Sequence, residues 1–187
     1  HRGFLHHRPM RDFLDLVDQR VSCRAYKTSP VPREMIDKIL RAVRFAPSAC
    51  NRQPWRLAIV TEPALRKTLA EKGILPGLGM KWIADAPVIL VLGMKKSFVT
   101  HQVAPSITGV DYSLLDIGIA GEHAILEATE LGLGTCWIGW INQKQTRKIV
   151  GWPADIVPQA FITIGWPAAT LQRKTSRLDV REISKQL

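Results

Sequence analysis

The feature that most constrains how this chain can fold is the stretch 111–131, which is apolar around a full helical circumference. Its leucines and isoleucines do not keep to one stripe, and it ends at Gly132-Leu133-Gly134, a typical helix C-terminus. A helix that is apolar on all sides must be buried on most of them. A chain of 187 residues forms about one domain and has little material left to wrap such a helix. We therefore expect the helix to pack across a symmetric dimer interface, with a central helix of a monomer as the alternative.

Small residues along the same stretch favour close approach of a second helix. They are Gly118, Ala120, Gly121, Ala124 and Ala128. We expect these residues to leave room for the partner's helix in the dimer.

The remaining patterns indicate short helices and strands in alternation. Helices are expected at 11–19, between Ser29 and Pro47, from Thr61 onward, and at 143–150. Strands are expected at 55–60, 87–92, 135–140 and 159–165. The run 87–92 is apolar throughout, so we expect it to be covered on both faces of a sheet. Together these elements predict a single α+β domain.

We place this domain at residues 11–187, with a polar and basic C-terminal extension after Pro167. Residues 1–10 are basic but lack the apolar centre of a signal peptide. We interpret them as a loose N-terminal arm or a remnant of expression. No apolar run approaches the roughly 18 residues of a membrane span, so we expect a cytoplasmic protein with no membrane partner.

The charge of the chain is strongly positive, with 26 Lys and Arg against 16 Asp and Glu, a net charge of +10. The excess is spread along the sequence without a long basic run, which is typical of a solvated surface. A nucleic-acid-binding module remains an alternative, and it would show steeply salt-dependent binding. We interpret Trp55, Trp137 and Trp140 as lying in apolar surroundings, which speaks against that class.

Familiar motifs of hydrolases, nucleotide-binding loops and zinc sites do not occur in the sequence. The three cysteines are scattered, so neither a disulfide framework nor a zinc site is expected. Three polar islands remain as candidates for chemistry.

The first island is Arg20-Val21-Ser22-Cys23-Arg24, directly after the first expected helix. Two guanidinium groups and a hydroxyl on alternate residues can converge on one phosphate, because the arginine fork matches phosphate oxygens. The alternative is an ordinary solvated helix end.

The second island is the loop from Ala46 to Trp55, which offers Ser48, Asn51 and Gln53. Side-chain amides both donate and accept hydrogen bonds, which suits a heterocycle with a mixed polar edge. The alternative is a rigid loop whose amides satisfy their own backbone.

The third island is Cys136-Trp137-Ile138-Gly139-Trp140 at the end of an expected strand. Glycine lets a flat ligand approach the backbone, and indole rings offer stacking area. The alternative is core packing by both tryptophans.

In combination these islands resemble the FMN-dependent nitroreductase family. The likeness rests on Arg20/Ser22/Arg24, the Pro-Ser-x-x-Asn-x-Gln-Pro-Trp loop at 47–55, the central helix from Asp116 to Gly134, and Ser176-Arg177-Leu178 near the end. The resemblance implies a central mixed β-sheet flanked by helices and an intertwined homodimer. One FMN would lie at each end of the subunit interface, with both chains contributing.

The resemblance also implies roles for particular residues. Arg20, Ser22, Arg24, Lys174 and Arg177 would bind the FMN phosphate and ribityl chain. Pro47, Ser48, Ala49 and Asn51 would reach the FMN held mainly by the partner, with Gln53 nearby. Trp137, Ile138 and Gly139 would line the flavin ring, and Lys81 would approach its pyrimidine edge. One departure concerns the tail, where Thr175 stands at a position often held by lysine and Lys174 comes one residue earlier.

The activity implied is an oxidoreductase that takes hydride from NAD(P)H onto flavin N5 and passes electrons to a nitroaromatic, a quinone or a related acceptor. One pocket would serve both substrates in turn, which gives ping-pong kinetics, and no side chain would need to act as a catalytic acid or nucleophile. The alternative is a flavin-binding storage or sensor protein with little turnover.

Overall fold

The computed structural model describes residues 12–95, 106–107, 109–173 and 175–187. The N-terminal arm expected over 1–10 and the candidate Lys174 lie outside the described residues. In chain order the elements are α1 Phe13–Gln19, α2 Arg33–Arg44, the 3-10 turn η1 Ala49–Asn51, β1 Trp55–Val60, α3 Pro63–Lys72, the 3-10 turn η2 Lys81–Asp85, β2 Val88–Lys95, α5 Tyr112–Glu130, β3 Gly134–Ile138, α6 Gln143–Ile149, β4 Ile156–Gly165 and α7 Val180–Ile183.

The four strands form one sheet in the order β1-β2-β4-β3, and each neighbouring pair is antiparallel. The expectation of a mixed sheet was therefore wrong for the named strands. Within the described part of the chain, parallel pairing occurs at the isolated bridge between Ser22 and Thr135. Because this is a single bridge, the segment around Ser22 is not a strand of the sheet, and the four named strands are all antiparallel.

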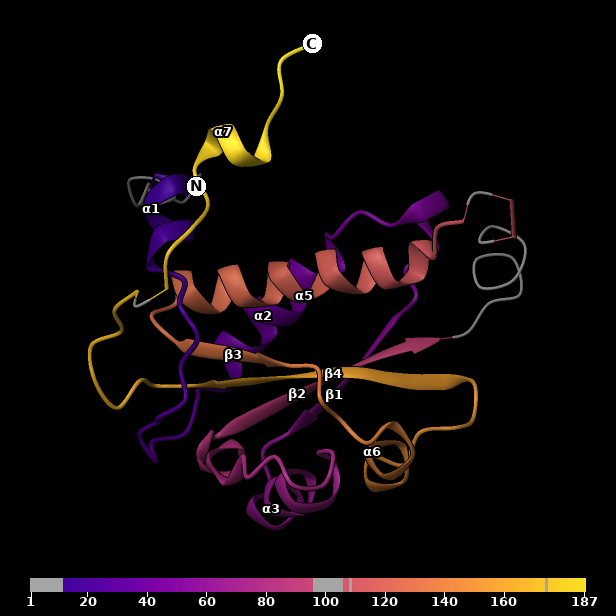
Figure 1. Ribbon diagram of the computed structural model, residues 1–187. Coiled ribbons are helices and arrows are strands. Elements are labelled where there is room, and N and C mark those ends of the chain that lie inside the picture. Colours follow the sequence, from indigo (N-terminus) through magenta and orange to yellow (C-terminus); the bar gives the residue numbers. More distant parts are fainter. Residues whose placement is uncertain (1–11, 96–105, 108, 174) are drawn as a thin grey trace, which may run out of the picture.

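Helices cover both faces of this sheet (Figure 1): α2 and α5 lie on one side, and α3 and α6 on the other. Leu90 and Leu92 of β2 belong to the core under α2 and α5. Ile89 and Val91, on alternate positions of the same strand, belong to the core under α3 and α6. The apolar run 87–92 thus fills both faces, as its composition predicts.

The long helix α5 is buried on one side only by its own chain. Its buried residues are Ser113, Asp116, Ile117, Ala120, Gly121, Ala124, Ile125 and Ala128. Leu114 and Leu115, by contrast, are 51% and 53% exposed, and Ile119 is 38% exposed. An apolar face of α5 is therefore uncovered in the single chain.

Most of the small residues on α5 serve a purpose other than the one expected. Ala120, Ala124 and Ala128 belong to the chain's own core, and a Cβ at Gly121 would overlap the ring of Trp137. At Gly118, in contrast, a Cβ would meet nothing within 4 Å. The expectation that all five leave room for a second helix was wrong for these four, because the close neighbours are the sheet and Trp137 of the same subunit.

The C-terminal extension leaves the core. In Figure 1, α7 lies beyond α1 and away from the sheet, and Leu178, Val180 and Ile183 are each about two-thirds exposed. No helix in the described ranges combines the length and the apolar character that crossing a membrane requires.

Candidate functional site

A pocket of about 370 Å³ brings together segments from the two ends of the described chain. Its lining includes Arg20, Ser22, Arg24, Arg173, Thr175 and Arg177. We call it the arginine pocket. Four of the residues that the sequence predicts for a phosphate site (Arg20, Ser22, Arg24 and Arg177) thus line one hollow, although more than 150 positions separate Arg177 from Arg24.

The edge of β3 holds the N-terminal side of the arginine pocket in place. Ser22 forms the parallel bridge with Thr135, and the Cys23 N–H donates to the Thr135 carbonyl over 2.7 Å. Arg20, Val21, Ser22 and Arg24 line the pocket, while the Cys23 side chain is buried in the core.

Beneath this segment lies a buried polar cluster. Cys136 lies there with a free, buried thiol, and burial raises the pKa of Cys136 while the Arg24 charge opposes that rise. The Tyr26 hydroxyl lies 2.7 Å from both the Cys23 carbonyl oxygen and Thr163 Oγ1. Burial raises the pKa of Tyr26 strongly, so both groups remain neutral at physiological pH and support the pocket as uncharged polar neighbours.

β3 also carries the turn with the two indole rings. Trp137 is 39% exposed and Trp140 66% exposed, so core packing is wrong as an interpretation of Trp140. Gly139 is exposed as well. Ile138 is 4% exposed and its side chain belongs to the core, so only its main chain could face a ligand. None of these residues lines the arginine pocket. Trp137 and Ile138 follow Thr135 on β3, and Gly139 and Trp140 come directly after that strand.

The loop after α2 is held by internal hydrogen bonds. The Gln53 N–H donates to Ser48 Oγ over 2.9 Å, and Gln53 Nε2 donates to Asn51 Oδ1 over 3.0 Å. Cys50, Asn51 and Gln53 all have positive φ values, near 50°. The alternative of a rigid, self-satisfied loop is thus correct in part, because these amides already bond to one another.

Asp116 ties this loop to α5. Its Oδ1 accepts a hydrogen bond from the Ala49 N–H at 3.0 Å, and the residue is 4% exposed. The opposite oxygen, Oδ2, has no hydrogen-bond partner within the described ranges, and neither has the Ser113 hydroxyl one turn earlier. The sequence reasoning used Asp116 only as part of a family pattern. The signal that could have indicated a structural role is a carboxylate among the apolar residues of this helix.

The loop residues Pro47, Ser48, Ala49, Asn51 and Gln53 do not line the arginine pocket. Lys81 is also separate, because it lines a hollow of about 500 Å³ with Leu75, Leu78 and Met80. The Leu75 N–H donates to the Trp140 carbonyl over 3.1 Å, which places this hollow beside the tryptophan turn.

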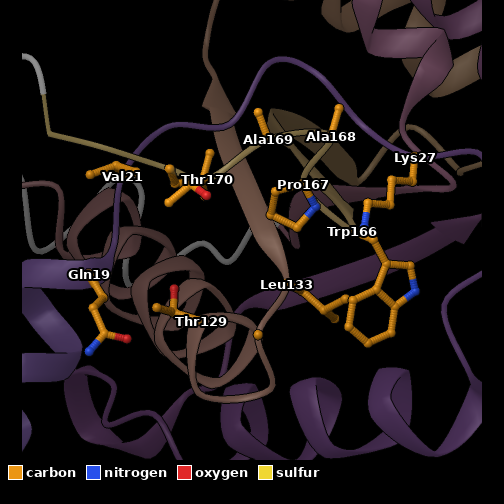
Figure 2. Close-up of a pocket in the computed structure, with 12 residues that line it drawn as sticks. Gln19, Val21, Lys27, Thr129, Leu133, Trp166, Pro167, Ala168, Ala169 and Thr170 are labelled. Carbon is orange, nitrogen blue, oxygen red and sulfur yellow. The ribbon is translucent and has the colours of Figure 1, made fainter.

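A larger cavity, of about 610 Å³, is lined in part by the segment that follows β4 (Figure 2). Its lining includes Gln19, Lys27, Thr129, Leu133 and Trp166. It contains none of the site residues that the sequence predicts. Across the described ranges, the structure has no group of three or more His, Cys, Asp or Glu side chains arranged for a metal ion.

The antiparallel sheet and the long helix α5 define an α+β protein. At the edge of β3 this protein has a pocket lined by four arginines, which is suited to an anionic ligand. A family model described as "Nitroreductase family" matches residues 17–75 and 74–166. This chain therefore belongs to the nitroreductase family, and the family expected from the sequence is confirmed.

Individual relatives agree with this assignment. The FMN reductase (NAD(P)H) of Bacillus subtilis is 33% identical over 171 residues, which cover 85% of this chain and 67% of that protein. The NADH dehydrogenase of Thermus thermophilus is 26% identical over 186 residues, covering 86% and 89%. Among solved structures, a nitroreductase family protein of Clostridium difficile 630 matches with a TM-score of 0.79 and 28% identity, covering 94% of this chain and 98% of that chain.

Proposed function

We propose that this chain is an FMN-dependent oxidoreductase that takes hydride from NAD(P)H and reduces nitroaromatic, quinone or related acceptors. The class and the cofactor follow from family membership: the chain is an NAD(P)H-dependent flavin oxidoreductase, and one relative is named for FMN reduction with NAD(P)H. The acceptor, the order of the reaction and the residue roles are the proposal.

The arginine pocket is the observation that carries the proposal. FMN differs from riboflavin by its phosphate, and the pocket offers the guanidinium groups of Arg20, Arg24 and Arg177. Arginine matches phosphate oxygens with paired N–H donors, and Ser22 adds a neutral donor. These residues fit the phosphate end of FMN. Lys174, the remaining candidate for the phosphate, stays a prediction because it lies outside the described residues.

The flavin ring would lie along the outer end of β3. Trp137 offers a partly exposed indole for stacking, and Gly139 lets a flat ring approach main-chain N–H groups. Lys81 would face the pyrimidine edge and stabilise negative charge there. The hollow lined by Lys81 lies beside Trp140, which supports this assignment.

When bound, FMN would supply hydride transfer at N5. The protein's part is to fix the phosphate, orient the ring and provide cations where negative charge develops. One pocket would serve both substrates in turn, so NAD(P)+ would have to leave before the acceptor enters. A ping-pong order follows, and no side-chain acid or nucleophile is required.

A homodimer completes the proposed site. The uncovered apolar face of α5 includes Leu114, Leu115 and Ile119, and a second copy would cover it. The loop that contains Ser48 and Asn51 does not line the arginine pocket of its own subunit, which suits a role at the partner's cofactor. The cytoplasmic location and the lack of a nucleic-acid partner stay predictions.

The decisive experiment is an absorption spectrum of the purified protein with added FMN, followed by anaerobic titration with NADH and NADPH. We expect a flavin spectrum that bleaches with reduced nucleotide and returns when a quinone or nitroaromatic is added. A flavin that binds but is never reduced would identify a storage or sensor protein. A protein that binds no FMN would contradict the proposal.

A further inference from the structure

Arg173 connects the C-terminal extension to the end of α1. Its Nη2 donates to three main-chain oxygens: that of Val17 at 3.2 Å, that of Asp18 at 2.7 Å and that of Arg20 at 3.2 Å. Its Nε donates to Asp18 Oδ1 over 3.3 Å. One guanidinium therefore binds the last turn of a helix more than 150 residues away in sequence.

The carbonyl contacts matter more than the ion pair. The Asp18 side chain is 83% exposed, whereas that of Arg173 is 23% exposed, and exposed ion pairs contribute little. The last carbonyls of a helix lack partners within the helix and favour a cation. Because α1 has no basic residue in its own last turn, Arg173 supplies the missing cation from the tail.

The position of Arg173 links both sides of the arginine pocket. It lines that pocket together with Arg20 and Arg177, and on its other side it lines an apolar hollow with Val17 and Leu178. The Arg177 Nη1 bonds only locally, to Thr175 Oγ1 and the Ser176 carbonyl, in the hydrogen bonds described for it. The contact of Arg173 with the Arg20 carbonyl thus joins the tail that carries Arg177 to the segment that carries Arg20.

The charges of the pocket oppose this arrangement. Arg20, Arg24 and Arg177 are all cationic, and like charges in one hollow repel before an anion binds. Arg173 adds a fourth positive charge, but its N–H groups are directed at carbonyl oxygens and at Asp18, which offsets its own repulsion. It can therefore hold the two segments together in the absence of an anion.

We propose that Arg173 is a positioning residue for phosphate recognition: it preorganises the arginine pocket by fixing the end of α1 against the C-terminal extension. This inference rests on the proposed FMN function. It assigns to Arg173 a role in the discrimination between FMN and riboflavin, which differ only in the phosphate. The role depends on the shape of the guanidinium, since Nη2 donates to the carbonyls while Nε donates to Asp18 Oδ1, and a lysine ammonium offers a single nitrogen.

The test compares the binding of FMN and of riboflavin to the full-length chain by quenching of flavin fluorescence. The variants are Arg173→Met, which removes the donors, and Arg173→Lys, which keeps the charge without the fork. Arg181→Met on exposed α7 is the matched control. Circular dichroism and thermal unfolding establish that each variant is folded.

We expect Arg173→Met to weaken FMN binding about ten- to a hundredfold, the effect of losing charge-assisted hydrogen bonds, and to leave riboflavin binding nearly unchanged. Arg173→Lys should recover only a small part of the loss, and Arg181→Met should match the unmodified chain. If Arg173→Lys restores full FMN affinity, the residue acts as a direct charge contact and the inference is wrong.

Two further outcomes would also overturn the inference. An unchanged ratio of FMN to riboflavin affinity in Arg173→Met would mean that Arg173 plays no part in phosphate recognition, while the proposed function would stand. If the unmodified chain bound neither flavin, the proposed function would fail, and the inference with it.

Discussion

Asp116 Oδ1 accepts a hydrogen bond from the Ala49 main-chain N–H at 3.0 Å. This contact joins the middle of the long helix α5 to the loop that follows α2. Neighbouring loop residues have left-handed backbone at Cys50, Asn51 and Gln53, a conformation that costs non-glycine residues free energy. The buried carboxylate therefore acts as an anchor that selects one conformation of the loop.

The first prediction concerns this anchor. Asp116→Ala should abolish the protection of the Ala49 amide against hydrogen exchange, because its acceptor is gone, whereas Asp116→Asn should retain most of it through the amide oxygen. The exchange rate of the Ala49 amide, measured by NMR in both variants, tests this prediction. Ser113→Ala is the control, since the Ser113 hydroxyl has no partner within the described ranges. A protected Ala49 amide in Asp116→Ala would contradict the assignment.

A second prediction tests the packing of the Trp137 ring against Gly121 of α5. Gly121→Ala should lower the free energy of unfolding by about 1–3 kcal/mol, because the new methyl group overlaps the indole ring and overpacking costs this much. Displacing the ring should also weaken FMN binding. Denaturant unfolding and flavin titration measure the two effects.

The control for this variant is Gly118→Ala on the same helix, where a Cβ meets no heavy atom within 4 Å. It should not reduce subunit stability, because alanine favours helix over glycine by roughly 1 kcal/mol. Equal losses of stability at both positions would show that the ring contact is not responsible.

The third prediction addresses the proposed dimer. Leu115→Glu should weaken dimer association by at least about a hundredfold, because an uncompensated buried charge costs several kcal/mol. Sedimentation velocity should then show monomers at micromolar concentration, and FMN affinity should fall in parallel. The same substitution at Leu65 on α3, which is 43% exposed, should leave the dimer intact. A dimeric Leu115→Glu protein would place the interface elsewhere.

A fourth prediction follows from the buried phenol of Tyr26. Its pKa is raised by burial, so the folded state keeps the proton after the unfolded chain, with a tyrosine pKa of about 10, has lost it. The stability contributed by Tyr26 is complete below about pH 10 and is lost as the pH rises further. In Tyr26→Phe this part of the alkaline decline should be absent.

At pH 8 the same variant should be less stable by about 1–3 kcal/mol, because the Cys23 carbonyl and Thr163 lose a buried partner. Urea unfolding at a series of pH values between 8 and 11 measures both effects. Tyr112→Phe, at a partly exposed position, is the control for removal of a phenol hydroxyl. An alkaline decline in Tyr26→Phe as steep as in the unmodified chain would refute the linkage.

Local patterns predicted the elements of the fold well. The strand expected at 55–60 is β1 at Trp55–Val60, and the apolar run 87–92 lies in β2 from its second residue onward, buried on both faces. Arg20, Ser22 and Arg24, which were expected to converge on one phosphate, line one pocket together with Val21. These predictions succeeded because the signal lies within a few neighbouring residues, where the period of the backbone is the deciding factor.

Other features depend on where separate elements meet. The antiparallel order of the sheet was not predicted, because a continuous apolar run such as 87–92 indicates burial on both faces and does not fix the direction of the neighbouring strands. Gly121 was expected to face a partner and instead lies under Trp137, since helical periodicity alone does not tell which neighbour a glycine approaches. The contacts made by Asp116 and Arg173 were not predicted for the same reason, as their partners are 67 and about 155 residues away.

By itself, then, the sequence determined the family, the helices and strands, and the basic side chains available for a phosphate. Each of these follows from residue types and their spacing over a few neighbouring positions. The tertiary structure alone decided that Arg177 joins Arg20 and Arg24 in one pocket, and that Arg173 binds the end of α1. Such contacts arise only when packing of the core brings distant segments to fixed positions, where hydrogen bonds of about 3 Å can form.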